Sequence, residues 1–155
     1  MPEMSDLPAP TDVYSPEKRS AVMRRVKSRD TRPELLVRRI LRQAGIGYRL
    51  DGRGLPGKPD LVMQGRRIAV FVHGCFWHGH DCARGAREPK SHTDYWRAKI
   101  GRNRERDTRN LEALTQAGWR VVTVWECEMK APGFPADLVA TIRSETRQAA
   151  TVSAA

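Results

Sequence analysis

IAVFVHGCFWHGHDC, residues 68–82, joins an apolar strand pattern to a dense group of chemically active side chains. Its first five residues are apolar and rich in β-branched side chains, which predicts a buried β-strand. The residues that follow hold three of the four histidines and two of the three cysteines in the chain. We therefore expect a strand that delivers metal-binding and proton-transfer groups at its end.

The composition of the chain predicts one globular domain that binds a polyanion. With 155 residues, of which 39% are hydrophobic, the chain is large enough to bury a core. Its 28 lysines and arginines against 18 aspartates and glutamates give a net charge of +10 and a pI of about 10.3. Nucleic acid is the first candidate partner for so basic a domain, although an arginine-rich surface can also be merely solvated.

The sequence also predicts where the protein works. No apolar run approaches the roughly 18 residues that a membrane span requires. The first residues, MPEMSDLPAPTDVYS, are acidic and proline-rich, unlike a secretory signal. We therefore expect a cytoplasmic protein without membrane association, a compartment in which disulfides are disfavoured. Metal ligation and plain burial are the remaining roles for its three cysteines.

Four helices are predicted from capping residues and apolar spacing. Ser15 and Pro16 are typical of a helix start and open a strongly basic first helix. A second helix over 31–44, a third over 93–116 and a fourth over 136–148 follow from the spacing of their apolar residues. For the whole chain we expect a disordered arm over 1–14, a single domain over 15–148 and a flexible tail over 149–155.

Four strand segments, over 47–50, 61–63, 68–72 and 119–125, alternate with these helices, which is typical of an α/β fold. The middle two segments are joined by a short turn, and we expect them to pair as a hairpin. Asp60 starts the first hairpin strand and His73 ends the second. Antiparallel pairing would therefore place these two side chains side by side.

Cysteine and histidine together indicate a metal site. Cys75, His80 and Cys82 follow a C-x4-H-x-C spacing, and Cys127 comes just after the last predicted strand. Structural zinc sites use four such ligands, so we expect these four residues to bind Zn²⁺. His78 is an alternative to His80 as a ligand. Burial of Cys127 as a small hydrophobe is the alternative to zinc ligation.

Glu34 allows two interpretations. Its spacing from Thr31 fits a capping box, in which the glutamate carboxylate accepts a hydrogen bond from the N-cap amide. The other interpretation is a carboxylate that points toward an active site. The spacing alone favours the cap.

The segment around Asp60 resembles the core of PD-(D/E)xK nucleases. In that core an aspartate opens a strand and holds Mg²⁺, and an acidic residue and a lysine follow on the next strand. Here Gly57-Lys58-Pro59-Asp60 matches the first half, whereas Phe71-Val72-His73 stands where the second half is expected. The resemblance implies a restriction-endonuclease-like fold, with a mixed central sheet flanked by helices, in a variant that uses histidine.

A more specific resemblance covers residues 15–127, most of the chain. The chain resembles the very short patch repair (Vsr) endonucleases at Pro59-Asp60, Val72 to His78, His80-x-Cys82, Tyr95-Trp96, Lys99-Ile100-Gly101, Asn103, Glu105-Arg106-Asp107, Gly118 to Val121, and Val124 to Cys127. That family nicks DNA at T:G mismatches, which arise when 5-methylcytosine deaminates to thymine. The resemblance implies a monomer, in the bacterial cytoplasm and associated with the nucleoid, that cuts 5′ to that thymine. It also implies mismatch-repair scaffold proteins and a repair DNA polymerase as partners.

The resemblance further implies roles for individual residues. Asp60 would bind the catalytic Mg²⁺ together with the backbone carbonyl of Val72, a position where many members carry threonine. His78 or His73 would handle protons, with help from Glu34. The structural Zn²⁺ would be held by the four residues named above, Cys75, His80, Cys82 and Cys127. The side chains that would wedge into the base stack at the mismatch are Phe76, Trp77 and Trp96.

Two rival functions are compatible with the residues. A zinc-stabilised DNA-binding module without activity would explain the charge, the Cys/His set and the aromatic residues. It leaves Asp60 and two histidines without a role. A non-specific nuclease with the same core would use those three residues as well. A Mg²⁺-dependent nicking assay on matched and T:G duplexes separates all three functions.

Overall fold

The computed structural model describes residues 15, 17–18, 20–21, 29–144 and 150–151. The predicted arm over 1–14, most of the predicted basic first helix and all of the tail except 150–151 lie outside the described residues. The regular elements are α2 (Arg32–Gln43), β1 (Leu61–Met63), β2 (Ile68–His73), α3 (Thr93–Gln116), β3 (Arg120–Trp125), α4 (Phe134–Arg143) and β4 (Ala150–Thr151). Two short 3-10 helices, η1 (Gln64–Arg66) and η2 (Glu126–Lys130), follow β1 and β3.

The four strands form one mixed sheet in the order β1-β2-β3-β4. β1 and β2 pair antiparallel, with Leu61 opposite Val70, which confirms the predicted hairpin. β2 and β3 run parallel, with His73 opposite Trp125 at their carboxyl ends, and β3 and β4 are also parallel. The predicted α/β architecture with a mixed sheet is therefore confirmed, and the residues that follow β2 and β3 emerge at the same end of the sheet.

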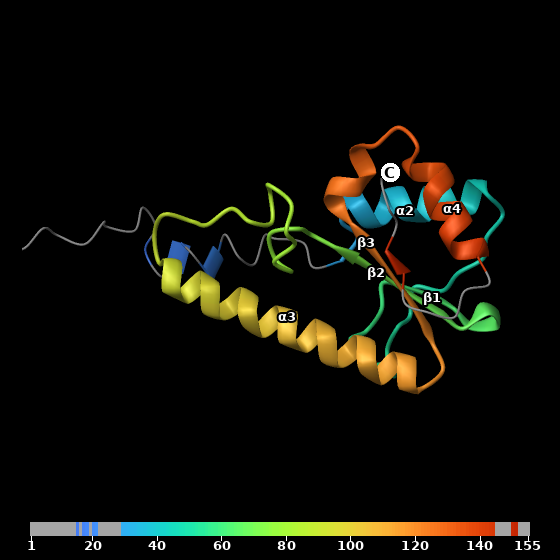
Figure 1. Ribbon diagram of the computed structural model, residues 1–155, viewed down its shortest axis with the longest axis horizontal. Helices are drawn as coiled ribbons and strands as arrows, with labels where there is room; N and C mark the ends of the chain where they lie inside the picture. The colour runs from blue at the N-terminus through green and yellow to red at the C-terminus, as the bar shows by residue number, and fades with distance from the viewer. Residues whose placement is uncertain (1–14, 16, 19, 22–28, 145–149, 152–155) are drawn as a thin grey trace, which may run out of the picture.

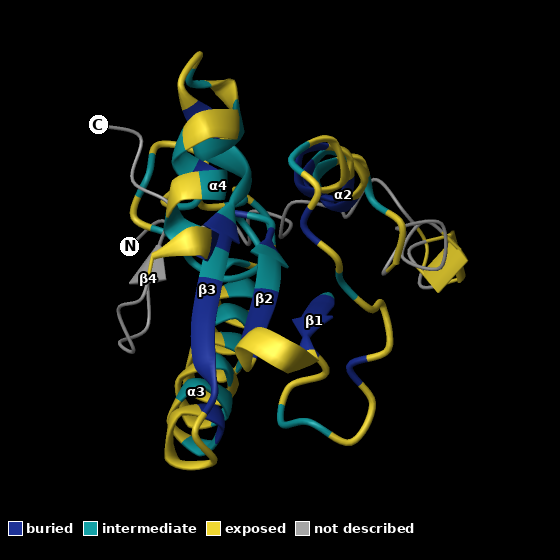
Figure 2. Cartoon of the chain, turned by 90° about the vertical axis from the view of Figure 1, so that its right-hand side faces the viewer, coloured by how far each residue is buried: buried dark blue, intermediate teal, exposed yellow. Residues whose placement is uncertain are grey.

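Helices cover both faces of the sheet, with α3 on one side and α2 and α4 on the other (Figure 1). The larger core cluster joins α2 and α4 to the sheet through residues that include Leu41, Val70, Val122 and Leu138. The smaller one packs Leu114 of α3 on the opposite face. Most of β3 is buried while the outward faces of the helices are exposed (Figure 2). This burial on both faces explains the continuous apolar runs of β2 and β3.

The start of α2 combines a helix cap with a buried carboxylate. The Thr31 hydroxyl accepts a hydrogen bond from the Glu34 backbone N–H at 3.4 Å, as the predicted cap requires. The Glu34 carboxylate, however, accepts from the backbone N–H of Asp30 at 2.9 Å and not from the N-cap amide. One half of the predicted capping box is therefore present, and Gly45, with φ +73°, follows the end of the helix as predicted.

Three local predictions differ from the structure. The segment over 47–50 forms only an isolated bridge, in which Arg49 pairs with Val62. β1 has three residues, and only the backbone groups of the middle one, Val62, point away from β2 and are free to pair with this segment. α4 ends at Arg143 rather than at Gln148, since helical spacing beyond Ile142 would bring polar residues to the buried face. In the segment predicted as a flexible tail, Ala150–Thr151 pairs with β3.

Among the described residues no helix is long and apolar enough to cross a membrane. The longest, α3, has 24 residues, but charged side chains occupy much of its length.

Arg67 closes the carboxyl end of α3 from the turn after β1. Its guanidinium donates to the carbonyls of Ala117 at 2.7 Å and Gly118 at 3.3 Å, and it lies 5.2 Å from the centroid of the Trp119 ring. Arg67→Ala is expected to lower the free energy of unfolding by about 1 kcal/mol, because cationic donors at a helix C-terminus satisfy its free carbonyls. Urea unfolding measures this change. Arg66→Ala, at the neighbouring exposed position, serves as the control and should be nearly neutral.

Candidate functional site

An open cleft of about 900 Å³ lies between the sheet and α3. It brings together four of the predicted site residues, Asp60, Val72, His73 and His78. Lys58, Arg104 and Arg106 also line it, which makes the cleft basic at its rim. Convergent titratable groups in a concavity are the usual mark of an active site.

Asp60 is fixed against the end of β2 by its backbone and its side chain. Its N–H donates to the Val70 carbonyl at 2.9 Å, and its Oδ2 accepts from the Val72 N–H at 2.7 Å. Since Leu61 pairs with Val70, Asp60 lies level with Phe71 and not directly beside His73 as predicted. Burial raises the pKa of the Asp60 carboxyl to about 6, against the opposing effect of the Val72 N–H.

The two cleft histidines are stacked face to face. The rings of His73 and His78 are 3.7 Å apart between centroids and within 1° of parallel. His73 is 9% exposed, and its buried Nδ1 has no hydrogen-bond partner in the described part of the chain. Burial, and then the neighbouring His78, lower the pKa of His73 to about 4. His73 is therefore neutral near pH 7.

Asp107 of α3 is a site residue that sequence reasoning did not select. Its Oδ2 lies 2.6 Å from Nδ1 of His78, so the carboxylate orients that ring and favours the tautomer protonated on Nδ1. Helical spacing was the signal that could have found it. Asn103, Asp107, Leu111 and Leu114 lie three or four residues apart on one face of α3, and Leu114 is in the core.

A second group of side chains converges beyond the carboxyl ends of β2 and β3. The candidate ligand atoms of Cys75, His80, Cys82 and Cys127 all lie within 4.8 Å of one another. Ligands around a tetrahedral zinc ion are separated by about 3.8 Å, as follows from a Zn–S distance of about 2.3 Å. The four residues therefore fit a metal ion of this kind, and His80, not His78, completes the set.

Strand pairing and one tight turn build this Cys/His cluster. His73 pairs with Trp125 at the ends of β2 and β3. Cys75 and Cys127 each follow two residues later, so the two cysteines lie beyond the same end of the sheet. The Gly85 N–H donates to Sγ of Cys82 at 3.3 Å, and a Cβ at Gly85 would come within 2.0 Å of the His80 carbonyl oxygen. Glycine is therefore required at position 85.

The thiols of the cluster differ in pKa. Burial raises the pKa of Cys75 and raises that of Cys127 to about 12. The Gly85 N–H, with help from His80, lowers the pKa of Cys82 to about 6. Thiols packed this closely resist becoming thiolates together unless a cation neutralises them, which is the chemistry a bound metal supplies.

The three predicted wedge residues, Phe76, Trp77 and Trp96, are half-buried and pack with the exposed Tyr95 into one aromatic cluster. Adjacent ring centroids are 5.2 to 5.9 Å apart, and Tyr95 is 51% exposed. The Lys99 ammonium lies 5.5 Å from the Trp77 ring centroid. None of the four belongs to either hydrophobic core cluster, so their packing with one another does not serve the interior of the domain.

Glu34 lies apart from these groups. It is 5% exposed and is not among the residues that line the cleft. Its charge nevertheless raises the pKa of Asp60, after the larger effect of burial. Glu34, at the start of α2, is therefore not part of the cleft wall, and its influence on Asp60 is electrostatic.

Comparison with known proteins places the chain in a family. A family model described as DNA mismatch endonuclease Vsr matches residues 11–84. The DNA mismatch endonuclease Vsr of Escherichia coli (strain K12) is 40% identical over 134 residues, covering 86% of this chain and 85% of that protein. The chain belongs to the Vsr family.

Two further relatives carry the name of type II nicking enzymes. V.XorIIP of Xanthomonas oryzae pv. oryzae is 51% identical over 123 residues, which cover 79% of this chain and 90% of that protein. V.NmeAIP of Neisseria meningitidis serogroup A is 47% identical over 120 residues, or 77% of this chain and 85% of that protein. Family membership confirms the resemblance inferred from the motifs.

The Vsr family model covers Asp60 and both cleft histidines but ends before α3. The 134-residue match to the Escherichia coli protein is long enough that it must also include Trp96, Asp107 and Cys127. The similarity to Vsr proteins therefore spans the cleft, the aromatic cluster and the Cys/His cluster.

Proposed function

We propose that this Vsr-family chain is a DNA endonuclease that nicks one strand of a duplex 5′ to the thymine of a T:G mismatch. The observation that carries the proposal is the convergence of Asp60, His73 and the His78–Asp107 pair in one basic cleft. Phe76 and Trp77 of the aromatic cluster follow His73 in the chain, and the Asn103 amide of α3 donates to the Trp77 carbonyl at 2.9 Å. The names of the relatives, a mismatch endonuclease and nicking enzymes, agree with this activity.

The residues that would hold a catalytic Mg²⁺ are Asp60 and the backbone carbonyl of Val72. The Asp60 carboxylate already lies against the Val72 N–H at 2.7 Å. In a strand the N–H and C=O of one residue point to the same side, so the Val72 carbonyl faces the edge on which Asp60 lies. Hard oxygen donors of this kind suit Mg²⁺, which when bound stabilises charge on the phosphate.

The arrangement also favours a restriction-endonuclease-like core. An aspartate precedes the first strand of a hairpin, and the second strand ends at the cleft, as in PD-(D/E)xK nucleases. His73 ends the second strand, which in that core carries an acidic residue and a lysine. We assign the chain to a histidine-bearing variant of this core.

His78 is the residue we assign as general base. Asp107 holds the His78 Nδ1 at 2.6 Å, which leaves Nε2 to take a proton from the attacking water. His73 stays neutral beneath it and keeps the His78 ring in place through their stacked faces. Histidine is the side chain that most often performs such proton transfer in enzymes.

Cys75, His80, Cys82 and Cys127 would hold a structural Zn²⁺. A set of four protein ligands leaves no open position for a substrate, so its role is to fix the segment after β2. That segment carries His78 at the cleft and Phe76 and Trp77 in the aromatic cluster.

A nicking assay tests the proposed function. With Mg²⁺ present, the wild-type chain should cut the thymine strand of a T:G duplex and leave the matched T:A and C:G duplexes nearly intact. Binding without cutting would favour a zinc-stabilised DNA-binding module instead. Equal cutting of all three duplexes would favour a non-specific nuclease with the same core.

Trp77→Ala tests how the mismatch is recognised. Lysine and arginine contacts to phosphates treat every duplex alike and set the salt dependence of binding. Inserting a ring between base steps costs a few kcal/mol, and less beside a mismatch, so the aromatic cluster is able to discriminate. Trp77→Ala should lower the preference for T:G over T:A by about tenfold and leave the slope of affinity against salt unchanged. Competition binding at several salt concentrations measures both quantities.

Tyr48→Phe, an aromatic change on the far side of the hairpin, is the control and should alter neither quantity. A Trp77→Ala variant with full T:G preference and a smaller salt slope would show that Trp77 positions the backbone instead.

A further inference from the structure

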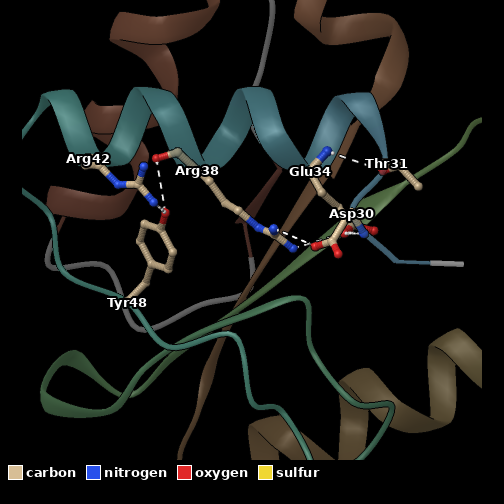
Figure 3. Close-up of polar contacts among 6 residues, drawn as sticks. All are labelled: Asp30, Thr31, Glu34, Arg38, Arg42 and Tyr48. Atoms are coloured by element: carbon tan, nitrogen blue, oxygen red, sulfur yellow. Dashed lines mark hydrogen bonds and ion pairs between the residues drawn. The ribbon is translucent and has the colours of Figure 1, made fainter. Parts of the chain in front are cut away.

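Three charged side chains at the start of α2 form a network that the proposed mechanism does not use (Figure 3). Arg38 donates from Nη1 to Oδ1 of Asp30 at 2.7 Å and from Nη2 to Oε2 of Glu34 at 3.3 Å. The same Glu34 oxygen accepts the Asp30 backbone N–H at 2.9 Å. The Glu34 carboxylate is therefore held from two directions.

The Arg38–Glu34 pair at the centre of this network is buried, which makes it costly, whereas the Asp30 side chain is 58% exposed. The side chains of Arg38 and Glu34 are 11% and 6% exposed, and the Arg38 Nε is buried without a hydrogen-bond partner among the described residues. Replacing a buried ion pair by apolar residues is often neutral or stabilising, so stability alone does not explain why one is present. An unsatisfied buried donor in a native protein also calls for an explanation.

The network acts on the cleft through Asp60. Glu34 raises the pKa of the Asp60 carboxyl, after burial, whereas Arg38 lowers it. The packing of α2 places the network near Asp60, because Val37, between Glu34 and Arg38 in the helix, lies in the same buried core cluster as Leu61, the residue after Asp60. Arg38 itself is too buried to contact DNA, and it does not line the cleft. Any effect of Arg38 on the reaction therefore has to pass through a neighbour.

We propose that Arg38 is a positioning residue for DNA cleavage, which holds the Glu34 carboxylate in place near Asp60. This inference rests on the proposed nicking function and extends it by one residue. Arg38 is suited to the task because its planar guanidinium contacts Asp30 and Glu34 at the same time, as a lysine ammonium on a flexible stem does less well. The helix supplies the spacing, since Glu34 and Arg38 are one turn apart on the same face.

Arg38→Met tests the proposal, because methionine keeps an unbranched side chain and removes the charge. Single-turnover nicking of a T:G duplex should slow by about 10- to 100-fold, the scale expected when a group near the reacting atoms is misplaced. Affinity for the same duplex and its salt slope should stay within about twofold, since Arg38 is not a phosphate contact. Arg38→Lys should recover part of the lost rate.

Arg42→Met is the matched control. Arg42 is one turn further along α2, is exposed, and donates to the Tyr48 hydroxyl at 3.1 Å, away from Glu34 (Figure 3). Arg42→Met removes one positive charge from α2, as Arg38→Met does, and this variant should nick at the wild-type rate.

The double variant Glu34→Gln with Arg38→Met separates positioning from folding. If Arg38 acts only through Glu34, the double variant should nick no more slowly than Glu34→Gln alone. It also removes both buried charges together, so it stays measurable even where Arg38→Met unfolds because Glu34 is left unpaired. Thermal unfolding shows whether Arg38→Met is folded. If it is folded, its nicking rate is compared with that of the wild type; if it is not, the double variant is compared with Glu34→Gln.

The outcomes distinguish this inference from the proposed function. A wild-type chain that nicks the T:G duplex, with Arg38→Met equally fast, would overturn the role of Arg38 alone. A double variant much slower than Glu34→Gln would do the same, because Arg38 would then act independently of Glu34. A wild-type chain that nicks no duplex would overturn the proposed function, and this inference with it.

Discussion

Asp60→Asn is expected to abolish nicking of a T:G duplex while leaving binding of that duplex no weaker. The Asp60 carboxylate lies against the Val72 backbone, and the proposed Mg²⁺ site depends on it. A metal contributes several kcal/mol of charge stabilisation, so the single-turnover rate should fall by about a thousandfold or more. Asparagine keeps an oxygen that can accept the Val72 N–H, and the lysines and arginines that hold the phosphates are unchanged. Parallel nicking and binding assays measure the two effects.

Asp51→Asn is the control for Asp60→Asn. Asp51 is in the preceding loop, where it pairs with Arg53 at 3.0 Å on the surface, and its variant should nick at the wild-type rate. Activity of Asp60→Asn close to that of the wild type, at any Mg²⁺ concentration, would place the metal elsewhere.

Asp60→Asn should also stabilise the metal-free protein against unfolding. Burial raises the pKa of Asp60 from 3.8 to about 6, so the ionised carboxylate costs the folded state about 3 kcal/mol above pH 6. In the presence of a chelator, Asp60→Asn should unfold several degrees above the wild type at pH 8. The difference should shrink as the pH falls below about 6, where the folded wild type takes up the proton. A variant that is less stable than the wild type at pH 8 would contradict this account.

Local signals explain why much of the fold was predictable. The hairpin joins two short apolar strands through a turn, and its pairing of Leu61 with Val70 places Asp60 at the cleft. The parallel pairing of β2 with β3 then brings Cys75 and Cys127 to one end of the sheet. Strand identity and chain order were enough for both results, because neighbouring strands in a small sheet have few alternative arrangements.

The residues that prediction missed depend on contacts that a linear pattern does not encode. His78 and Asp107 are 29 positions apart, and Asp107 is one polar residue in a helix crowded with them. Arg38 is one of four arginines in α2, and only packing against the sheet decides which of these is buried. The bridge at Arg49 and the early end of α4 were missed for a related reason, since the available pairing and packing surface set where an element stops.

Cys127→Ser is expected to remove a bound metal and to destabilise the whole domain. Purified wild-type protein should carry about one Zn²⁺ per chain, as a closed four-ligand site requires. Cys127 lies beyond β3 and Cys75 beyond β2, so one ion would tie together the ends of the two central strands. Because binding energy at a structural zinc site is folding energy, loss of one ligand should lower the melting temperature by about 10 °C or more. Elemental analysis and thermal unfolding measure the two effects.

Substitutions of two histidines, His80 and His92, provide a matched comparison for the zinc prediction. His80→Gln should reproduce the metal loss and the instability of Cys127→Ser, because His80 belongs to the Cys/His cluster. His92→Gln should do neither, because His92 is exposed and does not belong to the Cys/His cluster. Zinc removal from the wild type should also disorder the segment that carries His78 and Trp77, so nicking and T:G preference should fall together. A metal-free wild type with unchanged thermal stability would contradict the assignment, and the three thiols would then be packing groups.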